Sequence, residues 1–146
     1  MKTKIKFTRE RATFKKAHES DSGFDLTACN YRYKGKGLWH IMLGVEVEPP
    51  EGFYFEIVPR SSFSKTPFFV PNNIGIIDQG FRGEWRLPVR SVDFPRHDKE
   101  DDIEKYLLNK RIAQAILRPY LTTEIVIVDS LSDTERGECG FGSSGE

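Results

Sequence analysis

The chain has 146 residues, and its 22 Lys and Arg balance 22 Asp and Glu, so the formal net charge is zero. A chain of this length fits one domain around a single core. A neutral chain has no global field that would hold it on a nucleic-acid backbone or an anionic membrane. We therefore expect neither nucleic acid nor membrane as a partner, and any phosphate binding has to be local.

The cysteines and the N-terminus indicate the compartment. Cys29 and Cys139 lie far apart without a CxxC partner, so they suggest neither a disulfide framework nor a zinc site. The first residues, MKTKIKFTRERATFKKAHE, are charged throughout and lack the apolar core of a signal peptide. No later stretch approaches the roughly 20 apolar residues of a membrane span. We expect a soluble, cytoplasmic protein.

Short β-rich runs separated by Gly, Pro and Asp follow one another along most of the chain, which is typical of an all-β fold. The predicted strands are 24–28, 38–48, 53–58, 74–77, 84–92, 111–117 and 124–128. The turn VEPPEG at 47–52 separates two of them, because its prolines cannot donate to a ladder.

Two segments depart from the β pattern. Residues 96–109, RHDKEDDIEKYLLN, carry apolar residues at helical spacing and predict a short surface helix or a charged loop. The last residues are polar and glycine-rich, a composition too flexible for a core element. We expect one β domain over 1–135, with 136–146 as a C-terminal lid segment of the same domain.

The segment ECGFGSSGE at 138–146 carries a pattern suited to phosphate. Closely spaced glycines free backbone N–H groups to point at an anion, Ser143 and Ser144 add hydroxyl donors, and Arg136 supplies a charged fork. A disordered Gly/Ser tail is the alternative. A nucleotide P-loop is excluded because Glu146 stands where its lysine must be.

Two further segments could carry chemistry. Arg60, Ser61 and Ser62 follow an apolar strand and could bind phosphate oxygens, although such turns are usually just solvated. Asp78 follows another apolar strand, where a carboxylate can take a proton from water while Phe81 stacks on a sugar or base. An ordinary turn aspartate is the alternative for Asp78.

Asp25 starts an apolar strand, where a carboxylate requires either a partner or a hydrated metal. A buried structural role is equally compatible with that position. The histidines at 18, 40 and 97 show no metal-ligand spacing, and no GxSxG elbow is present. Histidine-ligated metal and serine-hydrolase chemistry therefore have no signature.

Five segments, in this order, resemble the five motifs of the trimeric dUTPase family: SDSGFDLTA, VPRSS, GIIDQGFRG, RIAQ and RGECGFGSSG. The resemblance implies a single-domain jelly-roll β fold and a homotrimer with three composite sites, each taking motifs from all three subunits. It also implies hydrolysis of dUTP to dUMP and pyrophosphate with Mg2+ as the cofactor. That reaction serves nucleotide metabolism and keeps uracil out of DNA.

The resemblance assigns roles to single residues. Asp78 matches the aspartate that activates water for attack on the α-phosphorus, Phe81 the aromatic that packs on the deoxyribose, and Asp25 an acid that approaches Mg2+ through water. The other substrate-binding positions are Arg60, Ser61, Ser62 and Gln114 toward phosphate; Asn72, Gly75 and Ile77 toward uracil; and, in the tail, Phe141 over uracil with Arg136, Gly142, Ser143 and Ser144 on the terminal phosphates.

Three residues depart from the family pattern: Phe81 replaces a tyrosine, Lys110 an acid and Cys139 a glycine. Two other functions are also considered. A dCTP deaminase would need a catalytic glutamate well along the strand after the third motif, whereas Glu84 stands at the turn. A dUTPase-like regulatory module could present residues 96–109 to a protein partner, which the sequence does not name.

Overall fold

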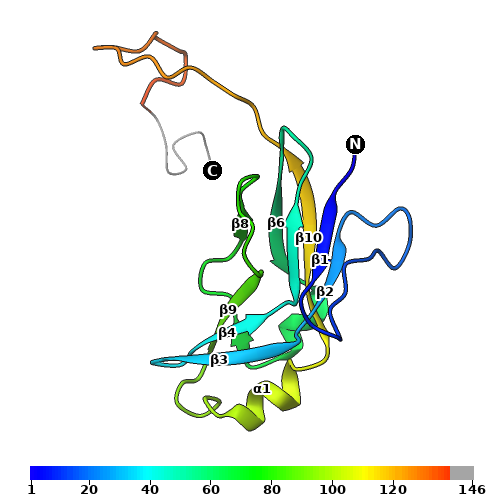
Figure 1. Ribbon diagram of the computed structural model, residues 1–146. Helices are drawn as coiled ribbons and strands as arrows, with labels where there is room; N and C mark the ends of the chain where they lie inside the picture. The colour runs from blue at the N-terminus through cyan, green and yellow to red at the C-terminus, as the bar shows by residue number, and fades with distance from the viewer. Residues whose placement is uncertain (139–146) are drawn as a thin grey trace.

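Antiparallel strands supply most of the regular structure in the computed structural model, which describes residues 1–138 (Figure 1). The strands are β1 (Lys4–Phe7), β2 (Phe24–Thr27), β3 (Asn30–Gly35), β4 (Leu38–Met42), β5 (Val45–Glu48), β6 (Phe53–Pro59), β7 (Phe68–Phe69), β8 (Gly75–Ile77), β9 (Arg86–Ser91) and β10 (Arg111–Pro119). The helical elements of the described chain are the 3-10 turn η1 (Ser61–Lys65) and helix α1 (Glu100–Tyr106).

Two four-stranded sheets enclose the core. One has the order β2-β10-β6-β8 and the other β3-β4-β9-β7, while β1 and β5 form a separate ladder. Alternate side chains of each sheet point inward, so that Phe55 and Ile57 of β6 share one buried cluster with Leu87 and Val89 of β9. Trp85, fully buried, packs its ring 5.4 Å from that of Phe55. This architecture confirms the predicted all-β jelly-roll fold.

The predicted strands agree with the observed ones up to β10, with one interruption. The run 38–48 is divided into β4 and β5 at Gly44, where φ is +70° and a Cβ would lie 2.8 Å from the Cβ of Ala12. Only glycine fits such a position without strain. Strands β1, β3 and β7 were not predicted. The first two carry many charged, exposed side chains, so their alternation was weak in the sequence.

The segment 96–109 contains the predicted short helix. The first turn of α1 contains Glu100, Asp101 and Asp102. Their negative charges interact favourably with the positive end of the helix dipole. Ile103 and Leu107 are buried and belong to the main core. The segment is therefore not purely peripheral, because its apolar side chains help to close one end of the sandwich.

The prediction of a strand at 124–128 was wrong for this chain. These residues have no regular structure, and the segment leads away from the body beyond β10 (Figure 1). Its apolar side chains are exposed, with 86% of Ile125 and 95% of Ile127 open to solvent. A strand requires a partner, and the described chain offers none here.

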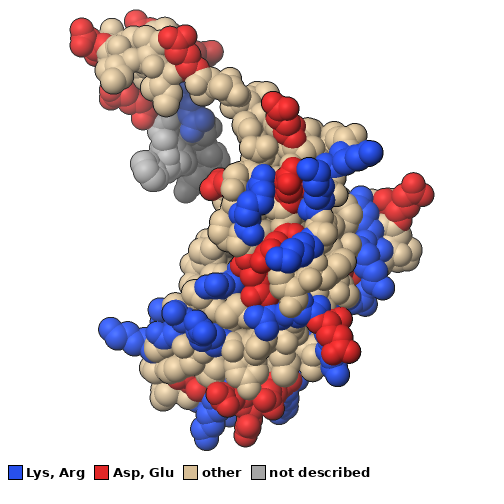
Figure 2. Space-filling model, viewed as in Figure 1, with Lys and Arg blue, Asp and Glu red and all other residues tan. Residues whose placement is uncertain are grey.

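The surface charge is mixed. On the face shown in Figure 2, basic and acidic side chains are interspersed over the middle of the body, and acidic ones gather at the lower end, where α1 lies. Among the described residues, no helix has both the length and the apolar character required to cross a lipid bilayer.

Candidate active site

A polar pocket of about 350 Å³ lies where β2, β10 and β6 meet. The register explains why distant segments converge there, since Gln114 on the central strand β10 stands opposite Asp25 on β2 and Val58 on β6. Arg60 and Ser61 follow the end of β6. The pocket is lined by Asp21, Ser22, Gly23, Asp25, Arg60, Ser61 and Gln114.

Asp25 is the most buried group of this pocket and is held by two arginines. Its Oδ1 lies 2.8 Å from Nε of Arg60, and its Oδ2 accepts a hydrogen bond of 2.8 Å from Nη1 of Arg111. The Asp25 side chain is 8% exposed, whereas those of Arg60 and Arg111 are 29% and 46% exposed. The buried carboxylate therefore orients two guanidinium groups whose remaining donors are available to an anion.

Gly23 allows Gln114 to reach into the pocket. A Cβ at position 23 would lie 2.6 Å from Oε1 and 3.0 Å from Cβ of Gln114. The glutamine side chain therefore lies directly against the backbone of the first motif. This close approach gives a physical reason for glycine at that position.

Ser62 faces a neighbouring hollow of about 200 Å³ instead of the polar pocket, and Arg111 and Lys110 line that hollow as well. Lys110 donates from Nζ to the carbonyl of Lys105, the last basic residue of α1. The lysine that replaces an acid here has a contact of its own, because a cation suits the carbonyl end of a helix.

The second site element is the turn after β8. Gly75 and Ile77 pair with Ile57 and Phe55 of β6, and the chain then turns through Asp78, whose carbonyl accepts the N–H of Phe81 at 3.0 Å. The Asp78 side chain is exposed and lines a hollow of about 450 Å³ with Tyr54, Ile76, Gln79, Gly80 and Tyr120.

The ring of Phe81 is 44% exposed and rests on Gly83. A Cβ at position 83 would lie 2.7 Å from Cζ of Phe81, so glycine makes room for the ring. Asn72 is exposed and contributes its carbonyl to the N–H of Ile74 at 2.6 Å. The polar pocket and the Asp78 hollow have no lining residue in common.

One chain therefore holds the two site elements apart. Tyr54, beside Asp78, stands near the start of β6, and Arg60 follows its end. This stretch spans about 20 Å at roughly 3.3 Å per residue. An Asp78 carboxylate cannot direct water onto a phosphate bound by Arg60 of the same chain across that distance, because proton transfer needs hydrogen-bond contact.

Glu84 is committed to a structural contact. Its carboxylate accepts a hydrogen bond of 2.9 Å from Nη2 of Arg9 and another of 3.0 Å from the hydroxyl of Thr8. The hydrogen bond from Arg9 is the largest cause that lowers the pKa of Glu84. A carboxylate stabilised in its charged form and paired on both oxygens is a poor general base. This contact counts against a deaminase that would use Glu84.

Several site residues were not predicted individually, although Asp21, Ser22 and Arg111 stand inside the recognised motifs and Asn73 lies just before the third. Asp21 and Ser22 line the polar pocket, Arg111 pairs with Asp25, and Asn73 lines a hollow beside Arg60 and Ser61 where Asn72 does not. Asn73 has a φ of +57°, a left-handed backbone that asparagine tolerates. Of these residues, Arg111 at the first position of RIAQ could have been predicted from the sequence as a partner of Asp25, because buried acids need cationic partners.

The tail positions are only partly described. Arg136 is exposed on the segment beyond β10. The predictions for Phe141, Gly142, Ser143 and Ser144 fall outside the described residues. The division of the domain between 135 and 136 likewise stays a prediction.

The fold and these two site elements define the class: an all-β jelly-roll protein with a polar pocket on one sheet, where Arg60 pairs with Asp25, and an exposed carboxylate on a neighbouring turn. The chain belongs to the dUTPase family, since the model of that family, described as dUTPase, matches residues 9–145.

Individual relatives agree with the family assignment. A deoxyuridine 5'-triphosphate nucleotidohydrolase of Alkaliphilus metalliredigens is 38% identical over 132 residues, covering 88% of this chain and 86% of that protein. The protein of the same name from Escherichia phage T5 is 35% identical and covers 97% of both chains. Among solved structures, the Staphylococcus bacteriophage 80alpha dUTPase with dUPNHPP superimposes with a TM-score of 0.77 at 27% identity, over 99% of each chain.

Proposed function

We propose that this chain hydrolyses dUTP to dUMP and pyrophosphate by attack of water on the α-phosphorus. The observation that carries the proposal is the pairing of Asp25 with Arg60 and Arg111, which brings cationic groups from motifs distant in the sequence to and beside one polar pocket. Membership of the dUTPase family and the names of the relatives support the same reaction.

The polar pocket would bind the triphosphate. Arg60, Ser61 and Gln114 present a guanidinium, a hydroxyl and an amide to one cavity, and these groups suit phosphate oxygens. Phosphoryl transfer requires positioning and charge neutralisation more than covalent chemistry. Ser62 and the tail residues Arg136, Gly142, Ser143 and Ser144 would add donors once the substrate closes the site.

The third-motif hairpin would bind the nucleoside and activate water. Asp78 would accept the proton of the attacking water, and the Phe81 ring would pack on the deoxyribose. Gly75, Ile77 and Asn72 would read uracil chiefly through backbone groups, and Phe141 would cover the base.

Mg2+ is the cofactor that we propose. Among the described residues, no group of three or more His, Cys, Asp or Glu side chains could hold a metal by itself. Both oxygens of Asp25 are occupied by arginines, which leaves it able to contact the metal through water instead of directly. Mg2+ bound by the triphosphate would offset the charge that develops on the phosphate oxygens.

We propose a homotrimer with composite sites, which the separation of the two site elements supports. The polar pocket and Asp78 lie about 20 Å apart in one chain, so in the proposed assembly a neighbouring subunit supplies one of them. The exposed apolar side chains of residues 121–131 offer a surface that a neighbouring chain would bury in this assembly. We place this assembly in the cytoplasm, where Cys29 would remain a free thiol.

Pyrophosphate release measured with dUTP, dTTP, dCTP and UTP tests the proposed function. We expect release from dUTP at least 100-fold faster, in kcat/KM, than from the other nucleotides. Polar groups that bind uracil reject the cytosine of dCTP strongly, and steric overlap should reject the 5-methyl group of dTTP and the 2'-hydroxyl of UTP. Ammonia release from dCTP would instead indicate the deaminase. No release from dUTP with Mg2+ present would contradict the proposal.

Phe81 should control the choice between dUTP and UTP. A ring packed against C2' excludes a ribose hydroxyl by steric overlap. Removing the ring should therefore lower kcat/KM for dUTP more than for UTP. We expect Phe81→Ala to lower kcat/KM for dUTP by roughly fivefold or more, an aromatic contact being worth about 1 kcal/mol, and to narrow the ratio of kcat/KM between dUTP and UTP.

Phe81→Tyr is the matched control for the sugar gate, because it restores the more usual residue of the family and retains the ring. Its kcat/KM values for dUTP and UTP should be close to those of the parent. A parental dUTP-to-UTP ratio in Phe81→Ala would show that Phe81 does not select the sugar.

A further inference from the structure

Arg82 ties together the turn that carries Asp78 and Phe81. Its Nη1 donates to the carbonyl of Gln79 at 2.6 Å and to the carbonyl of Phe81 at 3.0 Å. Inside the same turn, the N–H of Phe81 donates to the carbonyl of Asp78 at 3.0 Å. One guanidinium nitrogen therefore bridges two backbone groups that flank the exposed ring and follow the exposed carboxylate.

The turn has few other constraints. Strand β8, which leads into it, has three residues and pairs with β6 alone within the described chain. A Cβ built at Gly80 would meet no atom within 4 Å, so the middle of the turn is open on that side. Segments with so few contacts open locally at low free energy. The hydrogen bonds of Arg82 are thus a substantial part of what defines the turn.

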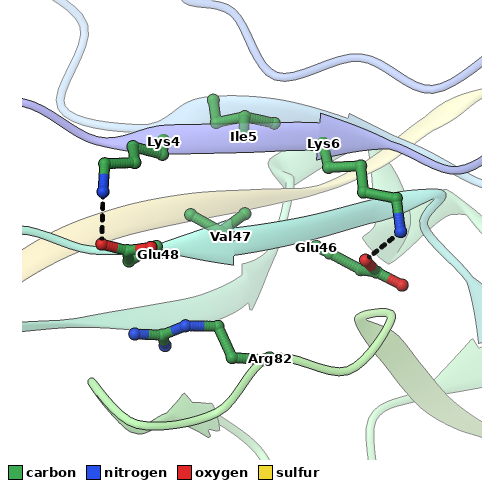
Figure 3. A pocket seen from close by; sticks show the side chains of 7 residues that line it. All are labelled: Lys4, Ile5, Lys6, Glu46, Val47, Glu48 and Arg82. Carbon is green, nitrogen blue, oxygen red and sulfur yellow. Dashed lines mark hydrogen bonds and ion pairs between the residues drawn. The ribbon is translucent and has the colours of Figure 1, made fainter.

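The charge of Arg82 also faces an acidic strand. Figure 3 shows its side chain extended across a hollow of about 260 Å³ from Glu46 and Glu48 of β5. These glutamates pair with lysines of β1: Lys6 with Glu46 and Lys4 with Glu48, both at 2.8 Å. These ion pairs hold the carboxylates of Glu46 and Glu48 in place on the side of the hollow that faces the guanidinium.

The pKa of Glu48 reflects the same arrangement. It is lowered first by the hydrogen bond from Lys4, then by the charge of Lys4, and also by the charge of Arg82. The interaction is therefore attractive, and it favours the extended arginine over conformers that leave the turn.

We propose that Arg82 is a positioning residue for the reaction, which holds Asp78 and Phe81 in the geometry that they need against a substrate bound by the neighbouring subunit. This inference rests on the proposed function. Arg82 touches neither the water nor the phosphorus. Its contribution is to keep a glycine-containing turn in one conformation, and a displacement of about 1 Å can cost roughly 100-fold in rate.

Arg82→Ala tests this role. We expect kcat for dUTP to fall about 10- to 100-fold, while the melting temperature stays near that of the parent. The affinity for a non-hydrolysable dUTP analogue should fall at most about fivefold, the loss expected if the Phe81 contact with the sugar is weakened. Arg82→Lys keeps a cation that can donate to carbonyls and should recover part of kcat. Arg96→Ala is the matched control, because Arg96 is 80% exposed and makes only a 3.9 Å ion pair with Asp93.

Hydrogen exchange of residues 78–83 distinguishes a failure of this inference from a failure of the proposed function. Amides of the turn should exchange faster in Arg82→Ala than in the parent, whether or not the protein hydrolyses dUTP. Faster exchange together with the loss of kcat supports the role. Unchanged exchange, or a kcat within twofold of the parent in an active enzyme, would overturn it, as would an equal loss in Arg96→Ala.

Discussion

Asp78→Asn should lower kcat for dUTP hydrolysis by about 10²- to 10⁴-fold, the range expected when a general base is removed. The amide keeps the shape of the carboxylate but cannot take the proton of the attacking water. Asp78 lies in the exposed turn after β8 and not in the polar pocket, so the contacts between that pocket and the phosphates should persist. Affinity for a non-hydrolysable dUTP analogue should therefore stay near that of the parent.

Single-turnover hydrolysis and analogue binding measure the two effects separately. Asp101→Asn is a matched control, since Asp101 is an exposed acid in the first turn of α1 and away from both site elements. Turnover of Asp78→Asn near the parental value would remove Asp78 from the role of base. A loss confined to analogue binding would assign it to substrate binding instead.

Two inactive variants should restore activity when they assemble together. Arg60→Gln removes the phosphate-binding charge but can still donate a hydrogen bond to Asp25, and Asp78→Asn removes the base. Each alone should lose at least about 100-fold in kcat/KM. In a homotrimer with composite sites, a site that takes Arg60 from one subunit and Asp78 from another can be intact in a mixed assembly.

Random mixing at equal ratio should make about one quarter of the sites intact, because each of two independent positions is occupied by the competent subunit half of the time. Co-expression with two different tags allows purification of the mixed trimers, in which about one third of the sites should be intact, because each mixed trimer has one junction of the correct order among its three. As control, Asp78→Asn mixed with the double variant Asp78→Asn/Arg60→Gln should stay inactive, since no subunit carries the base. No recovery in the first mixture would mean that Arg60 and Asp78 act from one chain or that no assembly forms.

Local sequence patterns predicted most of the fold. Strands such as β6 and β10 combine inward apolar residues with β-branched or aromatic side chains, so their existence follows from alternation and propensity. Helix α1 was one of two alternatives that the spacing indicated, the other being a charged loop. Strands β1 and β3 were missed because their charged faces hide the alternation, and the segment 124–128 was misassigned because strand propensity does not provide a partner strand.

The sequence by itself determined the family, the all-β class and the identity of the motif residues, because these depend on residue types and their order along the chain. Tertiary structure decided how those residues meet. It placed Asp25 between Arg60 and Arg111, paired Glu84 with Arg9 and kept Asp78 away from the polar pocket. Those contacts join residues up to 86 positions apart. Only the pairing and register of the strands bring such residues together, and no local pattern encodes that register.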